Sequence, residues 1–352
     1  MKKNAIISLF MAMSLCACEG LPLSEPVIRE QLEVQELTLA IPKGSTEIFR
    51  EVARELSRRA VDFAENSLSV DIVEVENIWE VLQDGSVDLV VCENKKAMQD
   101  AEKLGGLIYP EPHTAENTGE ESQIVEKPQI LGDAAMFAML DYPFFFHDGD
   151  CIIGGGSNED VLSALNYSLP DYFPMELKRL SYNGVYHWMT NDYEQLEGYL
   201  FEYGVSELLQ RFIDQGESLR DPWTRLEDGG LYIREVDLTN AKTDISERTL
   251  LLGGGRWKII DIFVNPETLS KLTEKQQAAI EEAIVYSGGY SKTLSDDQQA
   301  TILRQLEEGA VEMYPVDIDQ WYDTFQRIYC SGESEVNADL ANLLMEKTER
   351  FH

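Results

Sequence analysis

The stretch LTLAIP, residues 37–42, opens a run of alternating strand and helix patterns that closes at VDLVV, residues 87–91. LTLAIP is short, apolar and stopped by a proline, which predicts a buried strand. Residues 46–65 repeat apolar side chains at steps of three and four, which predicts an amphipathic helix. VDIVEV at 70–75 predicts a strand, and IWEVLQDG at 78–85 predicts a short helix that ends at its glycine. Strands that alternate with helices predict a parallel sheet with helices on its faces.

The chain continues as a second α/β region and then becomes mostly helical. Strands are predicted at 180–189, 231–236, 257–264 and 311–314, and helices at 194–213, 272–286, 295–309 and 318–329. The glycine runs at 154–156 and 253–255 predict breaks between secondary-structure elements. We expect the first run to be a turn that opens the second region, although such a loop before a helix can also bind an anion.

The amino-acid composition limits the classes of protein and partner that are compatible with this chain. The 352 residues carry 29 Lys+Arg against 64 Asp+Glu, for a formal net charge of −35. At about 150 residues per domain, this length predicts two lobes with sizeable cores. A hydrophobic fraction of 43% is too high for a disordered acidic chain. So negative a field repels phosphate backbones and anionic lipid headgroups, so we expect no nucleic-acid partner and no basic membrane-binding patch.

The N-terminus indicates where the protein works. Lys2 and Lys3 precede an apolar run at 5–13, and small residues follow, a pattern typical of a secretory signal. Leu15-Cys16-Ala17-Cys18 resembles the bacterial lipobox, which implies cleavage before Cys18, diacylation of Cys18 and retention on a membrane by the lipid. An ordinary cleaved signal or a buried N-terminal helix is the alternative. We expect an extracytoplasmic, lipid-anchored protein in the periplasm or on the outer face of the cell envelope.

The sequence offers no catalytic motif. It has no G-x-G-x-x-G, Walker lysine loop, G-x-S-x-G or H-E-x-x-H, and its four histidines lie far apart in the sequence. Pairs of acidic residues read as solvated surface in so acidic a chain. Cys92, Cys151 and Cys330 lack metal-ligand spacing, and they form either one disulfide or three free thiols. We therefore expect no metal, no cofactor and no enzymatic activity.

Several segments resemble, in order, the extracytoplasmic solute-binding subunits of tripartite ATP-independent periplasmic (TRAP) transporters, of the dicarboxylate-binding-protein type. The matching segments are VLQDGSVDL at 81–89, YPFFF at 142–146, YNGV at 182–185, FVN at 263–265 with LSKLTEKQQAAIEEA at 269–283, and LEEGAVE at 306–312. They resemble, respectively, a Leu-x-x-Gly-x-x-Asp helix-to-strand segment, a Pro-Phe-x-Phe crossing between lobes, an Asn-Gly-Phe strand end, a Val-Asn segment before an alanine-rich helix, and a Leu-x-x-Gly-Val-Glu-Val segment. Their order and spacing make the resemblance more specific than any one motif.

The resemblance implies an α/β, two-lobed fold of the periplasmic-binding-protein kind, with a ligand cleft between the lobes and C-terminal helices. The expected organisation is a signal peptide at 1–17, a tether at 18–35, the first part of lobe I at 36–145, lobe II at 146–235, and return strands with C-terminal helices spanning both lobes at 236–352. It also implies partners: a small organic solute, with an organic acid favoured, and the membrane permease subunits of a TRAP transporter.

Departures from the family pattern fall in the binding region. Members with carboxylate ligands usually carry an arginine shortly after a Leu-x-Gly, but here LEG at 196–198 is followed by YLFE. Arg225 and Arg234 flank the altered Gly229-Gly230 turn and are the substitute cations that we favour for a carboxylate. If neither binds the solute, the alternative is a neutral ligand or one stacked on aromatic rings. The candidate ligand-binding residues are Phe144, Asn183, Tyr186, Trp188, Arg225, Arg234 and Asn240.

Two other functions stay open from the sequence. A ligand-sensing lipoprotein that docks on a receptor kinase would share the export signal and the binding fold. An exported hydrolase is disfavoured by the missing nucleophile constellation. Neighbouring genes for two permease subunits or for a histidine kinase would separate transport from sensing.

Overall fold

A computed structural model describes residues 34–94, 96–97, 100, 140, 145–167, 169, 173–214, 224–225, 230–238, 249–309, 311–330 and 338–348. The chain divides into two units, Met1–Val34 and Gln35–His352, and all the elements below belong to the second. The predicted signal peptide, the lipidation residue Cys18 and all but the last two residues of the predicted tether lie outside the described residues.

The first part of the sheet is parallel, as the sequence predicted. β1 (Gln35–Pro42) pairs in parallel with β2 (Leu68–Val75) on one side and with β3 (Leu89–Glu93) on the other. α2 (Glu47–Phe63) connects β1 to β2, and α3 (Ile78–Asp84) connects β2 to β3. The apolar face of α2 is buried with β1, β2 and β3 in one hydrophobic core. Burial of that face is the main stabilising term for a helix of this kind.

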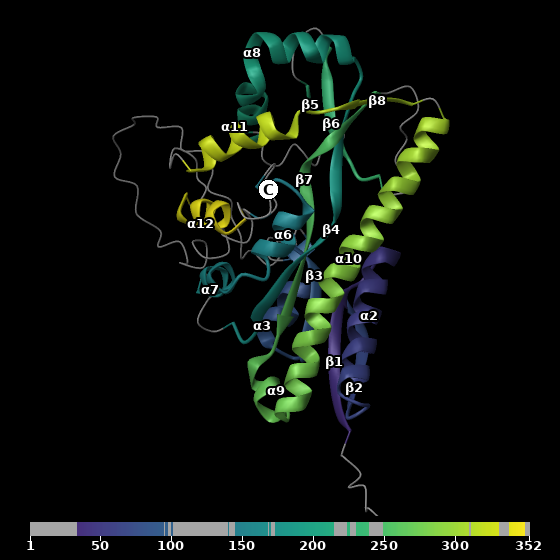
Figure 1. Ribbon diagram of the computed structural model, residues 1–352, viewed down its shortest axis with the longest axis vertical. Coiled ribbons are helices and arrows are strands. Elements are labelled where there is room, and N and C mark those ends of the chain that lie inside the picture. Colours follow the sequence, from purple (N-terminus) through teal and green to yellow (C-terminus); the bar gives the residue numbers. More distant parts are fainter. Residues whose placement is uncertain are drawn as a thin grey trace, which may run out of the picture. The chain divides into compact units, whose positions relative to one another are not determined.

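Two long strands continue the sheet (Figure 1). β7 (Thr249–Val264) is antiparallel both to β3 and to β4 (Glu176–Thr190). Beyond β4 lie β6 (Tyr232–Val236) and β5 (Thr224–Arg225), in the order β2-β1-β3-β7-β4-β6-β5. β4 and β7 therefore belong both to the part of the sheet around β1 and to the part around β6.

The next elements are a short strand and four helices. β8 (Glu312–Pro315) pairs in parallel with the start of β7. α8 (Tyr193–Asp214) follows β4 and is interrupted by a non-helical Gly204, and α9 (Pro266–Lys271) follows β7. The C-terminal helices α11 and α12 span Ile318–Cys330 and Ala338–Thr348. Trp321 of α11 packs against Trp188 of β4 with ring centroids 4.9 Å apart.

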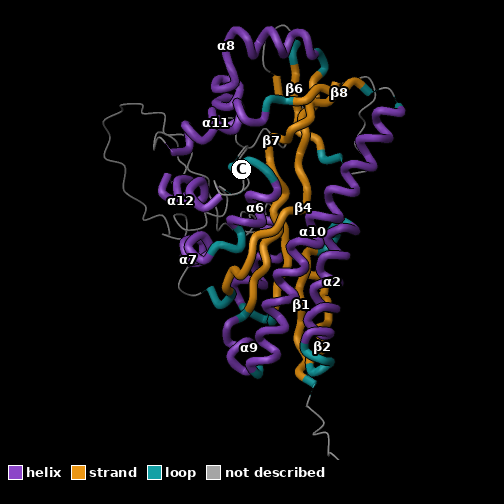
Figure 2. The backbone as a smooth tube through the Cα atoms, in the orientation of Figure 1, coloured by secondary structure: helices purple, strands orange, loops and turns teal. Residues whose placement is uncertain are grey.

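A single long helix replaces the two helices predicted at 272–286 and 295–309. α10 (Glu274–Glu308) has 35 residues and begins with a capping box between Thr273 and Gln276. It packs on α2 and on β4, and Figure 2 shows it as one continuous helix. The prediction of a break is wrong. The sequence suggests one because 287–294 is rich in small and polar residues, but tertiary contacts hold that segment helical. One such contact is the 2.6 Å hydrogen bond that Ser291 Oγ donates to the Tyr182 carbonyl.

The two glycine runs also differ from the expectation. Gly154 and Gly155 belong to α6 (Gly149–Gly155), and Gly156 caps it, so the turn to α7 (Glu159–Tyr167) comes only after them. Residues 253–255 lie within β7, which starts earlier than predicted. A strand tolerates glycine where the chain bends, and Gly253 has a φ of 133°, a conformation that other residues rarely adopt.

Three further findings concern the described part of the chain. None of its helices is long and apolar enough to cross a membrane. None of its His, Cys, Asp and Glu side chains gather in a group of three or more that could hold a metal ion. Cys92, Cys151 and Cys330 are free thiols, and burial raises the pKa of each. Of the two alternatives left by the sequence, the structure therefore has the three free thiols.

Candidate functional site

A pocket of about 290 Å³ opens at the ends of β1 and β3. Because these two strands are parallel neighbours, their carboxyl ends meet at the same edge of the sheet. The chain leaves β1 toward β2 on one side and returns to β3 on the other, so the pocket lies at a switch point of the strand order, where open α/β sheets bind ligands. The pocket is lined by Pro42, Lys43, Gly44, Ser45, Thr46, Phe49, Glu93, Lys96 and Tyr186.

One wall is the turn from β1 into α2. Gly44 has a φ of 80°, which favours glycine, and Ser45 Oγ donates a 2.6 Å hydrogen bond to the Pro42 carbonyl. Thr46 caps α2 by accepting a hydrogen bond from the Phe49 amide at 3.4 Å. The turn thus brings the positive end of the α2 dipole to the pocket.

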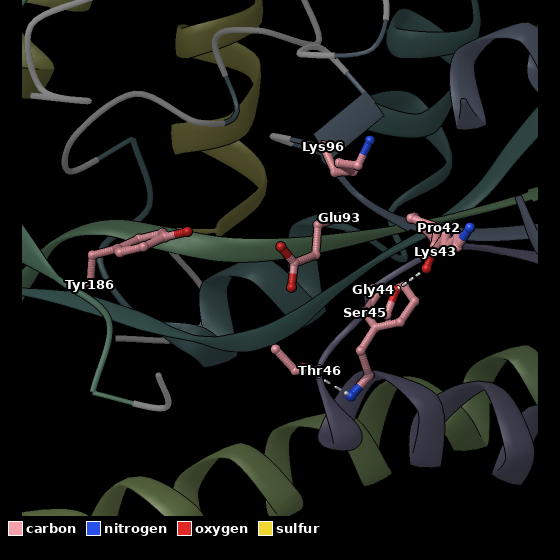
Figure 3. A pocket seen from close by; sticks show the side chains of 9 residues that line it. Pro42, Lys43, Gly44, Ser45, Thr46, Glu93, Lys96 and Tyr186 are labelled. Carbon is pink, nitrogen blue, oxygen red and sulfur yellow. Dashed lines mark hydrogen bonds between the residues drawn. The ribbon is translucent and has the colours of Figure 1, made fainter. Parts of the chain in front are cut away.

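The opposite wall comes from β4. Figure 3 shows the hydroxyl end of Tyr186 and the carboxylate of Glu93 turned toward one another across the pocket. The Arg256 guanidinium lies 5.5 Å and the Lys258 ammonium 5.3 Å from the centroid of the Tyr186 ring. Both cations come from β7, so the two long strands together position this wall.

The cations around the pocket are paired with carboxylates. Arg256 Nε donates to both oxygens of Glu235, at 2.9 and 2.8 Å, and Lys258 pairs with Asp237. In the lining itself, Lys43 pairs with Glu76, and Lys96 pairs with Asp100, a carboxylate that is only 1% exposed. The lining therefore holds two engaged ammonium groups, together with the carboxylate of Glu93.

Hydrogen bonds from neighbouring elements hold Glu93 in place. Asn183 Nδ2 of β4 donates to Glu93 Oε1 at 3.3 Å, and Ser295 Oγ of α10 donates to Asn183 Oδ1 at 3.4 Å. The residue after Glu93 is also fixed, because Asn94 Nδ2 donates to Asp261 Oδ2 at 3.0 Å. Glu93, Asn183 and Ser295 thus form a chain of hydrogen bonds that links β3, β4 and α10, and the Asn94–Asp261 bond separately ties the end of β3 to β7.

Further polar side chains are buried between β4 and α10. Gln299 Nε2 of α10 donates to the Tyr182 hydroxyl at 3.0 Å, and burial raises the pKa of Tyr182. His187 is also buried, and burial lowers its pKa to about 4. Its imidazole is therefore neutral at pH 7.

The structure brings together two of the sequence-predicted site residues. Tyr186 lines the pocket, and Asn183 donates a hydrogen bond to Glu93, which is another lining residue. Trp188 is 2% exposed and packs on Trp321, away from the pocket lining. Arg234 is half-buried in β6, where its backbone lies opposite that of Met189 in the neighbouring strand β4.

The other three candidate residues lie partly or wholly outside the described part of the chain. The backbone of Arg225 forms part of β5, but its side chain lies outside the described part of the structure. Phe144 and Asn240 lie wholly outside the described residues. Their assignment as ligand contacts stays a prediction.

Sequence reasoning missed Glu93, Lys96 and the loop at 43–46. A usable signal existed, since PKGST at 42–46 follows the first predicted strand directly and precedes the first predicted helix. In a parallel sheet that position faces the ligand edge. Glu93 and Lys96 stand in the same relation to the strand at 87–91.

Comparison with solved structures finds the same fold in periplasmic proteins. A TRAP periplasmic solute-binding protein from Rhodobacter sphaeroides, in an apo open form, is 12% identical, covers 90% of this chain and 99% of its own, and has a TM-score of 0.61. One from Desulfovibrio salexigens with bound orotic acid is 13% identical, with 90% and 99% covered and a TM-score of 0.54. One from Pseudomonas putida F1 with bound D-glucuronate is 15% identical, with 89% and 96% covered and a TM-score of 0.53.

No family model matches the chain, and no curated protein matches it in sequence. The structural similarity extends over about nine-tenths of the chain in each case. The chain therefore has the two-lobed α/β fold of TRAP periplasmic solute-binding proteins, and the fold that the sequence motifs predicted is confirmed.

Proposed function

We propose that this protein is an extracytoplasmic solute-binding protein that captures a small organic acid and delivers it to the membrane subunits of a TRAP-type secondary transporter. The observation that carries the proposal is the pocket at the carboxyl ends of β1 and β3, in a fold shared with TRAP solute-binding proteins. Two of those proteins hold organic acids, orotic acid and D-glucuronate.

The size and lining of the pocket suit a small polar solute. Its volume of about 290 Å³ lies just below the range of drug-sized ligand pockets, roughly 300–1,000 Å³, which suits a smaller solute. The lining combines an aromatic ring, Tyr186, with ammonium, carboxylate and hydroxyl groups. An aromatic face with a few placed polar groups is typical of sites that orient a small molecule.

We further propose that the solute closes the protein. In this view the lobes are those expected from the sequence, at 36–145 and 146–235, with 236–352 spanning both. β4 and β7 pass between the part of the sheet that holds Glu93 and the part around β6. Because Tyr186 belongs to β4 and Glu93 to β3, a hinge motion of these strands changes the width of the pocket.

We also propose that the mature chain is tethered to the membrane by a lipid on Cys18. Support comes from the charged, apolar and small-residue segments at 2–18 in the order of a lipoprotein signal. A tether keeps the binding protein near its permease. A single acyl chain binds membranes weakly, so stable anchoring takes more than one chain.

A thermal-shift screen against organic acids, amino acids and sugars tests the binding function. A ligand at about 100 times its Kd stabilises the folded state by about 2.7 kcal/mol, which raises the Tm measurably. We expect an organic acid to raise the Tm of the wild type and to raise that of Tyr186→Ala much less. Tyr167→Ala is the matched control, because Tyr167 is 92% exposed and outside the pocket lining. Failure of every compound to shift the Tm would contradict the proposal.

A further inference from the structure

We infer that Arg179, buried between β4 and α10, binds a small inorganic oxyanion such as sulfate or phosphate, at a site separate from the solute pocket. Arg179 lies near the start of β4 and Tyr186 lies beyond its middle, so roughly 20 Å of extended strand separates the two. The inference is therefore independent of the proposed function, which concerns the pocket that Tyr186 lines.

The first argument is that Arg179 is a buried cation without a carboxylate partner. The residue is 7% exposed, and a guanidinium stays ionised at any pH at which the protein is folded. Burial is the one influence that shifts its pKa, and within the described part of the chain no carboxylate opposes that shift. A buried charge that lacks a partner is costly, because it has lost water and gained nothing in exchange.

The second argument is a contrast with the other buried Lys and Arg side chains in the described part of the chain. Arg256 is paired with Glu235, and Lys258 is paired with Asp237. The sequence has 64 Asp and Glu residues, so acidic partners are abundant. Because Arg179 differs from both of these residues, we expect its counter-charge to come from outside the chain.

The third argument is the surroundings of the guanidinium. Arg179 Nε and Ser181 Oγ are both buried, and neither has a hydrogen-bond partner among the described residues. Both lie against Gly288 of α10, where an added Cβ would be 2.5 Å from Nε and 2.7 Å from Oγ. The nearby hydroxyls of Ser287 and Ser291 donate to backbone carbonyls instead. This part of the interface therefore has unsatisfied donors and no described acidic acceptor.

The fourth argument is access. Nε faces α10 and is shut off from solvent, whereas the two terminal nitrogens, Nη1 and Nη2, retain contact with solvent. These nitrogens form a planar fork that donates two hydrogen bonds to two oxygens of one oxyanion. A halide ion has a single centre and matches this fork less well. An oxyanion held there would neutralise Arg179 and stabilise the packing of α10 on β4.

Urea unfolding of the mature chain in sodium sulfate tests the inference, with sodium chloride at the same ionic strength as the reference. We expect sulfate to raise the unfolding midpoint of the wild type with a component that saturates, as binding to a site does. Exclusion of sulfate from the protein surface also stabilises, but that effect does not saturate. Arg179→Met should lose the saturable component, because its side chain is apolar and similar in length.

Arg58→Met is the matched control for the loss of one positive charge. Arg58 lies on the exposed face of α2, in ion pairs with Glu55 and Asp62. This variant should keep the saturable component, because the field of the whole chain changes by the same amount while Arg179 is untouched.

Equilibrium dialysis with labelled sulfate measures the binding directly and does not depend on stability. Arg179→Lys keeps the charge but loses the fork, so we expect it to bind sulfate roughly tenfold or more weakly than the wild type. Tyr186→Ala should bind sulfate as the wild type does, because the solute pocket is a different site. If Arg179→Met does not fold, Arg179→Lys carries the comparison.

Three results would overturn the inference. They are a wild type without saturable sulfate binding, folded Arg179 variants that bind sulfate as the wild type does, and binding that Tyr186→Ala loses but Arg179→Met keeps. The last result would place the anion in the solute pocket. None of them decides the proposed function, which the screen of organic acids tests.

Discussion

Gly288 of α10 lies directly against Arg179 of β4. A Cβ added to Gly288 would come 2.5 Å from Arg179 Nε and 2.7 Å from Ser181 Oγ, distances that side-chain carbons do not tolerate. Arg179 is 7% exposed, and burial lowers its pKa. The glycine therefore allows the long helix to approach β4 closely, and β4 is the strand that carries Asn183 and Tyr186.

Replacing this glycine tests that relationship. Gly288→Ala should lower the free energy of unfolding by about 1–3 kcal/mol, the usual cost of overpacking a tight interface. Gly289→Ala is the control in the same helix turn, since a Cβ there meets nothing within 4 Å. That change should be neutral or stabilise by up to about 1 kcal/mol, because alanine favours helix. Urea unfolding of both variants measures the difference, and equal stabilities would show that α10 does not depend on Gly288.

Acid should destabilise the protein through His187. Burial lowers the pKa of His187 in the folded state to about 4, whereas the unfolded side chain titrates near 6.5. The unfolded state therefore binds more protons between these values, so the stability from a neutral His187 is present above pH 6.5 and is lost as the pH falls toward 4. The groups that face it are Gln299 and Asp237, and Asp237 is itself paired with Lys258.

The size of this effect follows from the shift. At pH 4.5 the penalty from His187 is about 2 kcal/mol relative to pH 7. Carboxylates also titrate in this range, so the comparison is with His187→Gln, which cannot take up a proton. We expect the variant to lose about 2 kcal/mol less stability than the wild type between pH 7 and pH 4.5. Parallel pH profiles in urea unfolding would rule out a buried, neutral His187.

The first part of the fold could be predicted because its information is local. The segments at 37–42, 70–75 and 87–91 alternate with helix patterns of clear period, and β1, β2 and β3 lie at those places. The join within α10 could not, because the segment from Ser287 to Leu294 has no continuous apolar face. Its helix is fixed by contacts distant in sequence, such as Ser291 with Tyr182.

The candidate site was only partly predictable for a similar reason. Tyr186 and Asn183 stand out as an aromatic and an amide near the end of a strand pattern. Glu93 is one of 64 acidic residues, and nothing local separates it from solvated surface. The strand order, in which only β7 lies between β3 and β4, brings Glu93 and Tyr186 to one pocket.

Anchoring can be tested at Cys18. Cys18→Ala removes the thiol that the lipobox pattern assigns to the lipid, so the variant should lose incorporated palmitate and leave the membrane fraction or remain uncleaved. Cys16→Ala is the matched control, because alanine suits the same pattern and the lipidated residue is unchanged. Fractionation with labelled palmitate reads out both variants. Wild-type membrane attachment of Cys18→Ala would show that another element holds the protein.

Solute binding should contract the molecule. β4 carries register shifts against β7 on either side of Gly184, whose φ of 118° strongly favours glycine, so these strands have a place at which to bend. A solute that contacts both Glu93 and Tyr186 stabilises the arrangement in which β3 and β4 approach each other across the pocket. Small-angle scattering should therefore give a smaller radius of gyration for the saturated protein than for the free protein. Tyr186→Ala, at a solute concentration that saturates it, should contract less because one of the two contacts is gone. An unchanged radius in the saturated wild type would mean that the pocket is rigid, and that its selectivity comes from the fixed positions of these side chains.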